Sequence, residues 1–254
     1  MVVNPGDSRA PYLQVADALR REIESGRLAP GDRLQSTREI SERFDVTGAT
    51  AQRAVGVLKT EGLLEGVTGR GVFVRRPRQW RAVSSRYVSV PSAGEQDRWT
   101  TEAAKDGRLG TQQITFVGEV EAPDDIGDLL GLSDGEPAVV RKRVMFLDGE
   151  PVELTDTYFP ASLVRGTRIT DMRKIPRGAR ALMAELGYPP RKALETVYAR
   201  MPTPDERREL RLGAGVPVFR VVRTVLSDDD LPVEVDVMIL GGDRNRLEYD
   251  VPVQ

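Results

Sequence analysis

Two arginines and a set of hydroxyl and carboxyl side chains are the residues of this chain best suited to bind a small charged molecule. Arg141 and Arg143 lie two residues apart in an apolar run, so in a β-strand both point to the same face. Glu153, Thr155 and Thr157 share one face of the next expected strand. Because arginine binds phosphate and carboxylate groups through a planar fork of N–H donors, these residues predict a site for an anionic or zwitterionic metabolite. A structural network of salt bridges is the alternative.

Two residue types that carry much of protein chemistry are missing from the chain. Among its 254 residues there is no cysteine and no histidine, so no disulfide, thiolate nucleophile, zinc finger or Ser-His-Asp triad can form. Histidine-based iron sites are excluded on the same ground. We therefore expect no metal and no cofactor, and a binding protein rather than an enzyme.

The amino-terminal residues and the hydrophobic pattern bear on location. Residues 1–10 are polar and carry no apolar signal-peptide core, and no run of 18 apolar residues exists. The sequence thus predicts a cytoplasmic protein that makes no contact with a membrane.

The charge is unevenly distributed along the chain. The 37 basic and 39 acidic residues give a net charge of −2. Residues 1–81 hold 14 basic and 10 acidic side chains, whereas residues 82–254 hold 23 basic and 29 acidic ones. A basic first third joined to an acidic remainder is typical of a DNA-binding domain attached to a second domain. A merely solvated basic face is the alternative.

Hydrophobic periodicity predicts two helices early in the basic segment. The first is expected over residues 11–25, where apolar residues recur at helical spacing. Proline suits the first position of this helix, and Gly26 ends it. The second helix begins at Ser36, which fits a capping box with Glu39, and it ends near Phe44.

A third helix and a hairpin complete the basic segment. Thr47 is the expected cap of a helix over residues 48–61. The β-type runs at 63–65 and 72–74 are separated by a glycine-containing turn and predict a small hairpin. Two short helices joined by a tight turn and followed by such a hairpin form a winged helix-turn-helix.

Four stretches of this segment resemble the signature of the GntR family of transcriptional regulators. They extend with few gaps from about Arg9 to Arg76, so the resemblance covers the whole predicted winged helix-turn-helix. It implies binding to double-stranded DNA, with the start of the third helix in the major groove. The matching stretches are Pro11-Tyr12-Leu13-Gln14, Ile23 to Leu34, Ser36-Thr37-Arg38-Glu39 and Gly69 to Val74.

The same resemblance implies which side chains contact DNA. Residues at the start of the third helix that face away from the core can reach bases, and Arg38 matches a position that reads guanine or a nearby phosphate. Arg70 at the tip of the wing can enter the minor groove. The alternatives are that Thr47 acts only as a cap and that Arg38 and Arg53 are merely solvated. The candidate DNA-binding residues are Ser36, Thr37, Arg38, Thr47, Gly48, Ala49, Thr50, Gln52, Arg53, Gly69 and Arg70.

The sequence departs from the family pattern at positions that read DNA. Gln35-Ser36-Thr37-Arg38 replaces the common Pro-Ser-Glu-Arg, and Gly48 and Gln52 occupy positions that are usually or often arginine. The loss of one guanine-reading side chain costs about 1–3 kcal/mol of discrimination. Because glutamine pairs with adenine, we expect an operator that differs from the common family sequence.

The remainder of the chain is predicted to be a linker and a second domain. We assign residues 1–76 to the winged helix-turn-helix, 77–90 to a linker and 91–254 to the second domain. Within these, residues 87–90 are typical of a short strand and residues 96–106 of a helix.

The second domain contains an internal repeat. Leu132-Ser133-Asp134-Gly135-Glu136-Pro137 recurs as Leu212-Gly213-Ala214-Gly215-Val216-Pro217. Each copy precedes a predicted strand, and Arg143 of the first strand matches Arg223 of the second. A polar turn then leads to a further strand in both copies, and Asp-Gly in the first turn is a good hairpin signal.

The further strand opens with Pro-Val-Glu in both copies, at 151–153 and at 232–234. Short helices are expected over 123–130, 178–186 and 203–212. The chain is therefore predicted to be α+β, with duplicated hairpins forming an antiparallel sheet beside which the helices lie.

The order of these elements resembles the UTRA effector-binding domain of the HutC subfamily of GntR regulators, whose fold is related to chorismate lyase. The matching stretches are Leu132 to Pro160 and Glu195 to Tyr249. The absence of histidine agrees with this subfamily, because GntR relatives with a helical sensor commonly bind metal through histidines. With the strand pattern, the resemblance places the effector contacts at Arg141, Arg143, Glu153, Thr155 and Glu234.

We therefore expect a homodimeric repressor whose paired sensor sheets carry two heads on a palindromic operator, and which a small-molecule effector releases. Two alternatives stay open. An effector-independent repressor is one, because Leu240 replaces the tyrosine that phosphosugar-sensing relatives usually carry and marks a degenerate pocket in that case. A chorismate-lyase-like enzyme acting through Arg141, Arg143 and Glu153 is the other.

Overall fold

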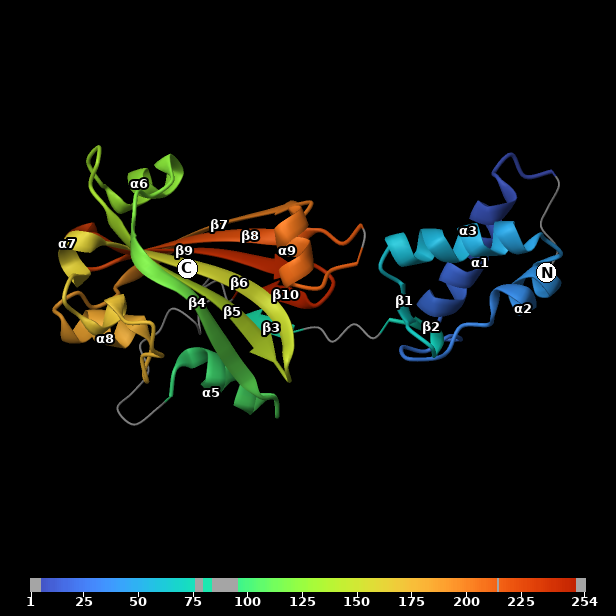
Figure 1. Cartoon of the computed structure of the whole chain (residues 1–254), viewed down its shortest axis with the longest axis horizontal. Helices are drawn as coiled ribbons and strands as arrows, with labels where there is room; N and C mark the ends of the chain where they lie inside the picture. The colour runs from blue at the N-terminus through green and yellow to red at the C-terminus, as the bar shows by residue number, and fades with distance from the viewer. Residues whose placement is uncertain (1–5, 76–79, 84–95, 214, 250–254) are drawn as a thin grey trace, which may run out of the picture. The chain divides into compact units, whose positions relative to one another are not determined.

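The computed structural model describes residues 6–75, 80–83, 96–213 and 215–249 (Figure 1). The chain divides into two compact units, the first comprising Met1–Gln79 with Leu212–Val216 and the second comprising Trp80–Arg211 with Pro217–Gln254. Each unit has its own apolar core. The α+β class and the order of a helical head before a sheet-containing domain are as predicted.

The first unit is a winged helix-turn-helix. Its three helices pack around a core that includes Leu19, Leu34, Ile40, Phe44 and Leu58, all of them buried. The hairpin that follows the third helix is antiparallel. The elements are α1 Pro11–Glu24, α2 Thr37–Phe44, α3 Gly48–Thr60, β1 Leu64–Val67 and β2 Gly71–Val74.

Local chemistry begins and ends the two helices of the helix-turn-helix. The Ser36 hydroxyl accepts a hydrogen bond from the Glu39 backbone N–H, and the Glu39 carboxylate accepts one from the Ser36 N–H. This confirms the predicted capping box. Asp45 ends α2 in the left-handed conformation, with a φ of 55°, which aspartate tolerates better than most residues. Thr47 caps α3 as predicted, since its hydroxyl accepts from the Thr50 N–H.

The second unit is built on a six-stranded antiparallel sheet with the strand order β4-β5-β6-β9-β8-β7. The strands at 138–147 and 218–226 agree with the predicted ones. Two strands at the edges of the sheet, β4 and β7, were not predicted. The elements are β4 Gly110–Val120, β5 Ala138–Leu147, β6 Glu150–Pro160, β7 Lys192–Arg200, β8 Val218–Leu226 and β9 Pro232–Gly241.

The predicted repeat gives this sheet two matching halves. The halves β4-β5-β6 and β7-β8-β9 meet where β6 pairs with β9. Arg143 of β5 lies opposite Thr155 of β6, and Arg223 of β8 lies opposite Asp236 of β9. Each hairpin also carries one register shift near the start of its second strand. The equivalence of Arg143 and Arg223 that the sequence predicts therefore holds in three dimensions.

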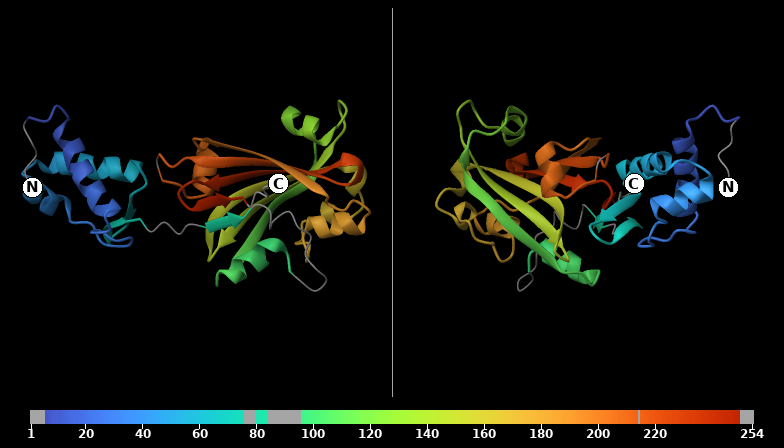
Figure 2. Two further views of the ribbon diagram at one scale, coloured as in Figure 1. Left: turned by 180° about the vertical axis from the view of Figure 1, so that it is seen from behind. Right: turned by 45° about the vertical axis from the view of Figure 1, so that its right-hand side comes forward.

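Helices cover both faces of the sheet (Figure 2). Helix α6 packs against Val140, Tyr158 and Val235 on one face. Helices α7 and α8 pack on the opposite face, and α5 lies beside β4. Their bounds are α5 Arg98–Lys105, α6 Asp124–Leu130, α7 Ala161–Val164, α8 Ala179–Glu185 and α9 Pro204–Glu209, with single 3₁₀ turns at Arg168–Thr170 and Asp228–Asp230.

A small parallel pair of strands lies outside the main sheet. β3 Trp80–Val83 pairs in parallel with β10 Asn245–Glu248. Residues 80–83, which lie in the stretch 77–90 that the sequence predicts to be a linker, form this strand. Pairing with a partner so distant in sequence leaves no local pattern to recognise. The strand expected over 87–90 lies outside the described residues.

No helix in the described part of the chain is long and apolar enough to cross a membrane.

Candidate functional site

The candidate DNA-binding surface lies at the start of α3 and on the wing. All of the predicted DNA-binding residues are exposed except Thr50, which is half-buried. Ala51, Ala54 and Val55, on the opposite side of α3, are buried in the core. The helix therefore presents one polar side to solvent, as reading a major groove requires.

Several of the predicted contact residues already have partners within the first unit. Arg38 forms an exposed ion pair with Glu42 at 2.8 Å. Arg53 stacks on the ring of Tyr12 in α1, with its guanidinium carbon 3.9 Å from the ring centre. The Thr47 hydroxyl serves as the helix cap. Contacts of these residues with bases or phosphates stay predictions.

The wing presents Arg70 at its tip. Gly69 and Gly71, on either side, have φ angles of +73° and +117°, which residues other than glycine rarely adopt. The Arg70 guanidinium lies 5.9 Å from the ring centre of Phe73. The two glycines thus turn the chain so that one cation lies at the exposed end of the hairpin.

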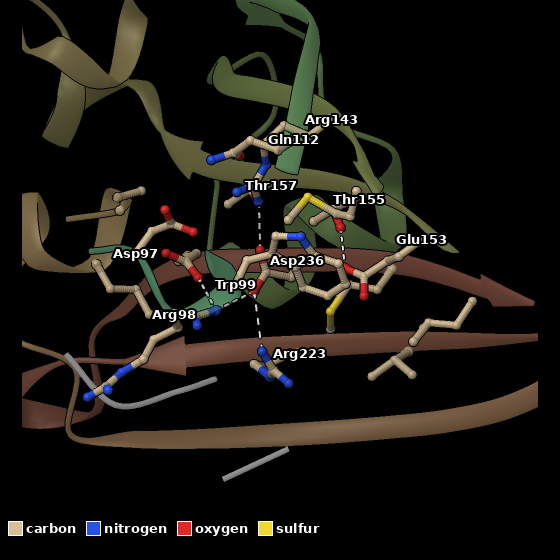
Figure 3. Close-up of a pocket in the computed structure, with 18 of the residues that line it drawn as sticks. Asp97, Arg98, Trp99, Gln112, Arg143, Glu153, Thr155, Thr157, Arg223 and Asp236 are labelled. Atoms are coloured by element: carbon tan, nitrogen blue, oxygen red, sulfur yellow. Dashed lines mark hydrogen bonds and ion pairs between the residues drawn. The ribbon is translucent and has the colours of Figure 1, made fainter. Parts of the chain in front are cut away.

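A cavity of about 150 Å³ lies on one face of the six-stranded sheet in the second unit (Figure 3). Charged side chains from β5, β6, β7, β8 and β9 enter it from the sheet, and Arg98 and Trp99 enter it from α5. Met145, Met238 and Leu247 are among its apolar lining residues. The charged lining residues are Asp97, Arg98, Arg143, Glu153, Arg177, Arg180, Glu195, Arg223, Glu234 and Asp236.

Arg143 has few interactions inside this cavity. Its Nη2 donates to the Thr157 hydroxyl at 2.5 Å, and its buried Nε has no hydrogen-bond partner within the described chain. Thr157 in turn donates to Oδ1 of Asp236 at 2.6 Å. Arg143 therefore donates to a neutral hydroxyl oxygen, whereas a buried arginine ordinarily donates to a carboxylate.

Arg223 and Arg180 are bound by carboxylates. Arg223 lies 2.5 Å from an oxygen of Glu195 and 3.9 Å from Asp236. Arg180 lies 2.6 Å from Glu234 and also contacts Asp236. These ion pairs form the structural network that was the alternative interpretation, so one part of the cavity is internally neutralised.

Arg141 does not line the cavity, contrary to its predicted effector contact. It is 4% exposed, and its guanidinium donates to the carbonyl oxygens of Ile169, Asp171 and Arg173 at 2.6, 2.6 and 2.9 Å. Burial lowers the pKa of Arg141 to about 10, and the charge of Arg143 acts in the same direction. The strand periodicity placed it on the correct face, but the segment after α7 covers it.

The other predicted effector residues do line the cavity. Glu153 accepts a hydrogen bond from the Thr155 hydroxyl, and burial raises its pKa. Burial also raises the pKa of Glu234 to about 7, against the opposing effect of Arg180. Asp236 has a lowered pKa, because Arg180 and Arg223 outweigh its burial. The cavity thus combines carboxyl groups of different proton affinity.

Each of the two units matches a known protein family. The family of bacterial regulatory proteins known as the gntR family matches residues 11–74, and the UTRA domain family matches residues 106–246, more than half of the chain. The chain belongs to the GntR family of transcriptional regulators and carries a UTRA domain. The family is one of bacterial regulatory proteins.

Individual relatives agree with this assignment. A helix-turn-helix transcriptional regulator of Streptomyces coelicolor is 28% identical over 96% of this chain and 94% of its own. The transcriptional repressor NagR of Bacillus subtilis is 23% identical over 92% of this chain and 91% of its own. The crystal structure of a GntR-family regulator superposes with a TM-score of 0.66 at 29% identity and covers 96% of this chain and 98% of that one.

Several cavity residues of this GntR-family regulator escaped sequence reasoning. Arg223 carried a signal, since the repeat equates it with Arg143, and Asp236 lies two residues after Glu234 on the same strand face. No sequence signal pointed to three other lining residues, which lie outside the repeated strands on α5, on α8 and on an unpredicted edge strand: Arg98, Arg180 and Glu195.

Proposed function

We propose that this regulator is a homodimeric, cytoplasmic repressor of the HutC subfamily, released from a palindromic operator by a small anionic or zwitterionic metabolite. The observation that supports an effector most directly is Arg143, whose guanidinium lies in the cavity and has, among the residues that the structure describes, a threonine hydroxyl and no carboxylate as its partner. The cavity lies in the UTRA domain, and the DNA-binding surface lies in the GntR domain.

The DNA half of the proposal rests on the exposed side of α3 and the wing. Two copies related by two-fold symmetry bind two half-sites, so the operator is a palindrome. Repression is supported by one relative, the transcriptional repressor NagR of Bacillus subtilis. Release by an effector requires only that it binds the conformation with low DNA affinity more tightly, and the ratio of the two affinities sets the extent of release.

Binding of the purified protein to the palindromes near its own gene tests the DNA half. We expect binding that weakens steeply with salt, because phosphate contacts release counterions. Arg70→Ala should weaken binding and reduce the salt slope by about one unit. Arg27→Ala, which removes an exposed arginine outside the candidate surface, is the matched control. A protein without salt-sensitive preference for any of these palindromes would contradict the proposal.

A metabolite panel read by thermal shift and by release of operator DNA tests the effector half. We expect a compound that raises the melting temperature of the wild type and of Arg207→Ala, an exposed control on α9, but not of Arg143→Ala. Compounds whose effect survives Arg143→Ala do not use this cavity as proposed. If no metabolite acts through Arg143, the regulator is an effector-independent repressor.

A further inference from the structure

Equivalent charged residues in the two halves of the UTRA sheet have different ion-pair partners. In the second half, Arg223 lies between two acids, because its partners across the strands are Glu195 on β7 and Asp236 on β9. Both acids lie within ion-pair distance of the guanidinium. This half of the sheet neutralises its own arginine.

The first half lacks both of these acids. The residues opposite Arg143 are Ile114 on β4 and Thr155 on β6, neither of which is charged. Within the described chain, no carboxylate forms an ion pair with Arg143, and its Nε is buried without a hydrogen-bond partner. Arg143 is half-buried, and because a cation partly removed from water without an ionic partner is costly, an anion is the partner that this arginine lacks.

The equivalent glutamates of the two halves also differ in whether a cation binds them. Glu234 forms an ion pair with Arg180 at 2.6 Å. Its equivalent in the first half, Glu153, has the Thr155 hydroxyl as its hydrogen-bond partner and no cation within ion-pair distance in the described chain. Arg143, Arg223 and Asp236 act on Glu153 only from beyond ion-pair distance, so a cation in direct contact is the partner that this carboxylate lacks.

One small molecule can supply both missing charges. Arg143 and Glu153 lie on the same face of adjacent strands, two positions apart in register, because Arg143 is opposite Thr155 and Glu153 is opposite Met145. Such diagonal neighbours lie roughly 7–8 Å apart, and their β-carbons are somewhat closer. Trp99, Met145 and Leu240, which also line the cavity, offer an apolar surface beside the two charges.

We infer that the effector is a small zwitterion whose carboxylate, phosphonate or phosphate binds Arg143 and whose ammonium group binds Glu153. This inference rests on the proposed effector pocket and narrows its ligand class to compounds that carry both charges. The bound molecule gives the first half of the sheet the two charge partners that the second half contains within its own chain.

Matched compounds that differ only in the amino group test this inference. The probes are the twenty standard L-amino acids and 2-aminoethylphosphonate, with glutarate, 4-methylpentanoate and ethylphosphonate as the amine-free partners of glutamate, leucine and aminoethylphosphonate. Binding to the full-length protein is measured by calorimetry and thermal shift. We expect at least one amine-bearing compound to bind, and removal of its amine to weaken binding about tenfold or more, the usual effect of a hydrogen bond to a charged group.

One variant and a matched control test whether Glu153 binds the ammonium end of the ligand. Glu153→Gln keeps the shape of the side chain and should weaken the zwitterion about tenfold or more while leaving amine-free anions unchanged. Glu121→Gln, an exposed change of the same kind outside the cavity, should have no effect. Operator binding and the melting temperature without ligand show that each variant is folded.

The pH dependence of ligand affinity distinguishes two ways in which Glu153 can bind a ligand. Ionised Glu153 accepts from an ammonium group, whereas protonated Glu153 donates to an anion. An ammonium group needs the ionised carboxylate, so affinity should fall as the pH falls through the raised pKa of Glu153. Affinity that rises instead, or a Glu153→Gln variant that binds zwitterions normally, overturns the inference.

The remaining outcomes distinguish this inference from the proposed function. If only amine-free anions bind, and they do so through Arg143, the zwitterion is excluded and the effector pocket stands. If none of the probes binds, the zwitterion inference falls. If no metabolite of the wider panel acts through Arg143 either, the effector half of the proposed function falls with it.

Discussion

At the scale of single residues, the arrangement around Arg143 depends on one buried hydroxyl. Thr157 is 2% exposed, accepts a hydrogen bond from Arg143 and donates one to Asp236. Asp236 is itself held by Arg180 and Arg223. The internally neutralised half of the sheet thus orients the hydroxyl that positions the arginine of the other half.

Replacing the Thr157 hydroxyl tests whether it positions Arg143 for ligand binding. Thr157→Val has nearly the same shape but leaves a donor of Arg143 and an acceptor of Asp236 unpaired, so the unfolding free energy should fall by about 1–3 kcal/mol. Any ligand that acts through Arg143 should bind about tenfold or more weakly. Thr157→Ser should restore both quantities, measured by urea unfolding and calorimetry. Equal behaviour of the two variants would show that the hydroxyl does not position Arg143.

Gly48 occupies a position where the family resemblance predicts a guanine-reading arginine. A β-carbon at Gly48 would meet no atom of the described residues within 4 Å, so a side chain can leave the backbone here without a clash at its first carbon. Gly48→Arg should strengthen binding to operators with guanine at the corresponding position by about 1–3 kcal/mol relative to other bases. Gly56→Arg adds the same charge to an equally open site further along α3 and should strengthen all sequences alike. A competition assay with base-substituted operators measures the difference.

At the scale of elements, the close approach of α5 to β4 shapes one wall of the cavity. A β-carbon on Gly110, the first residue of β4, would lie 2.7 Å from the β-carbon of Ala103 and 3.0 Å from the carbonyl oxygen of Trp99. Trp99 and Gln112, on these two elements, both line the cavity. Only glycine at this position lets the helix lie so close to the strand.

Adding a methyl group there should therefore displace the helix. Gly110→Ala should lower the unfolding free energy by about 1–3 kcal/mol, the usual cost of overpacking, and weaken ligand binding in the cavity. Gly127→Ala, inside α6 where a β-carbon meets nothing within 4 Å, should be neutral or stabilising by up to about 1 kcal/mol. Thermal unfolding of both variants provides the comparison, and equal melting temperatures would refute the close packing.

The elements also show what could be predicted from the sequence. Helices with caps and strands of the repeat were predicted because their signals are local: Ser36 with Glu39, or Pro-Val-Glu at two places. The strands β4, β7 and β3 were missed because pairing with distant partners stabilises them. For the same reason, the strand face of Arg141 was predicted, but the carbonyl groups that occupy its guanidinium were not.

At the scale of the whole molecule, the buried carboxyl groups make stability depend on pH. The folded chain holds the proton of Glu234 up to about pH 7, whereas an unfolded glutamate releases it near 4.5. Between these values the folded state binds more protons, so this group's contribution to stability falls as the pH rises. Asp236, whose pKa is lowered, is ionised in both states across this window and contributes no slope there.

Glu234→Gln should remove this pH dependence. The unfolding free energy of the wild type relative to the variant should decrease by up to about 3 kcal/mol from pH 5 to pH 8. Tryptophan fluorescence follows the second unit selectively, because both tryptophans, Trp80 and Trp99, belong to it. Urea titrations at four pH values measure the difference, and a constant difference would show that Glu234 has an ordinary pKa.

The parallel pairing of β3 with β10 has a consequence for how the protein is made. β3 is the first strand of the second unit to leave the ribosome, and its partner is among the last described residues to be synthesised. Asn245, at the start of β10, is buried and donates to the carbonyl oxygens of Val152 and Gly241, so it also joins the main sheet. The first unit completes its core early and can fold during translation, as amino-terminal domains commonly do. A nascent chain that stops before Asn245 would therefore carry a complete GntR domain and a UTRA domain without its last strand.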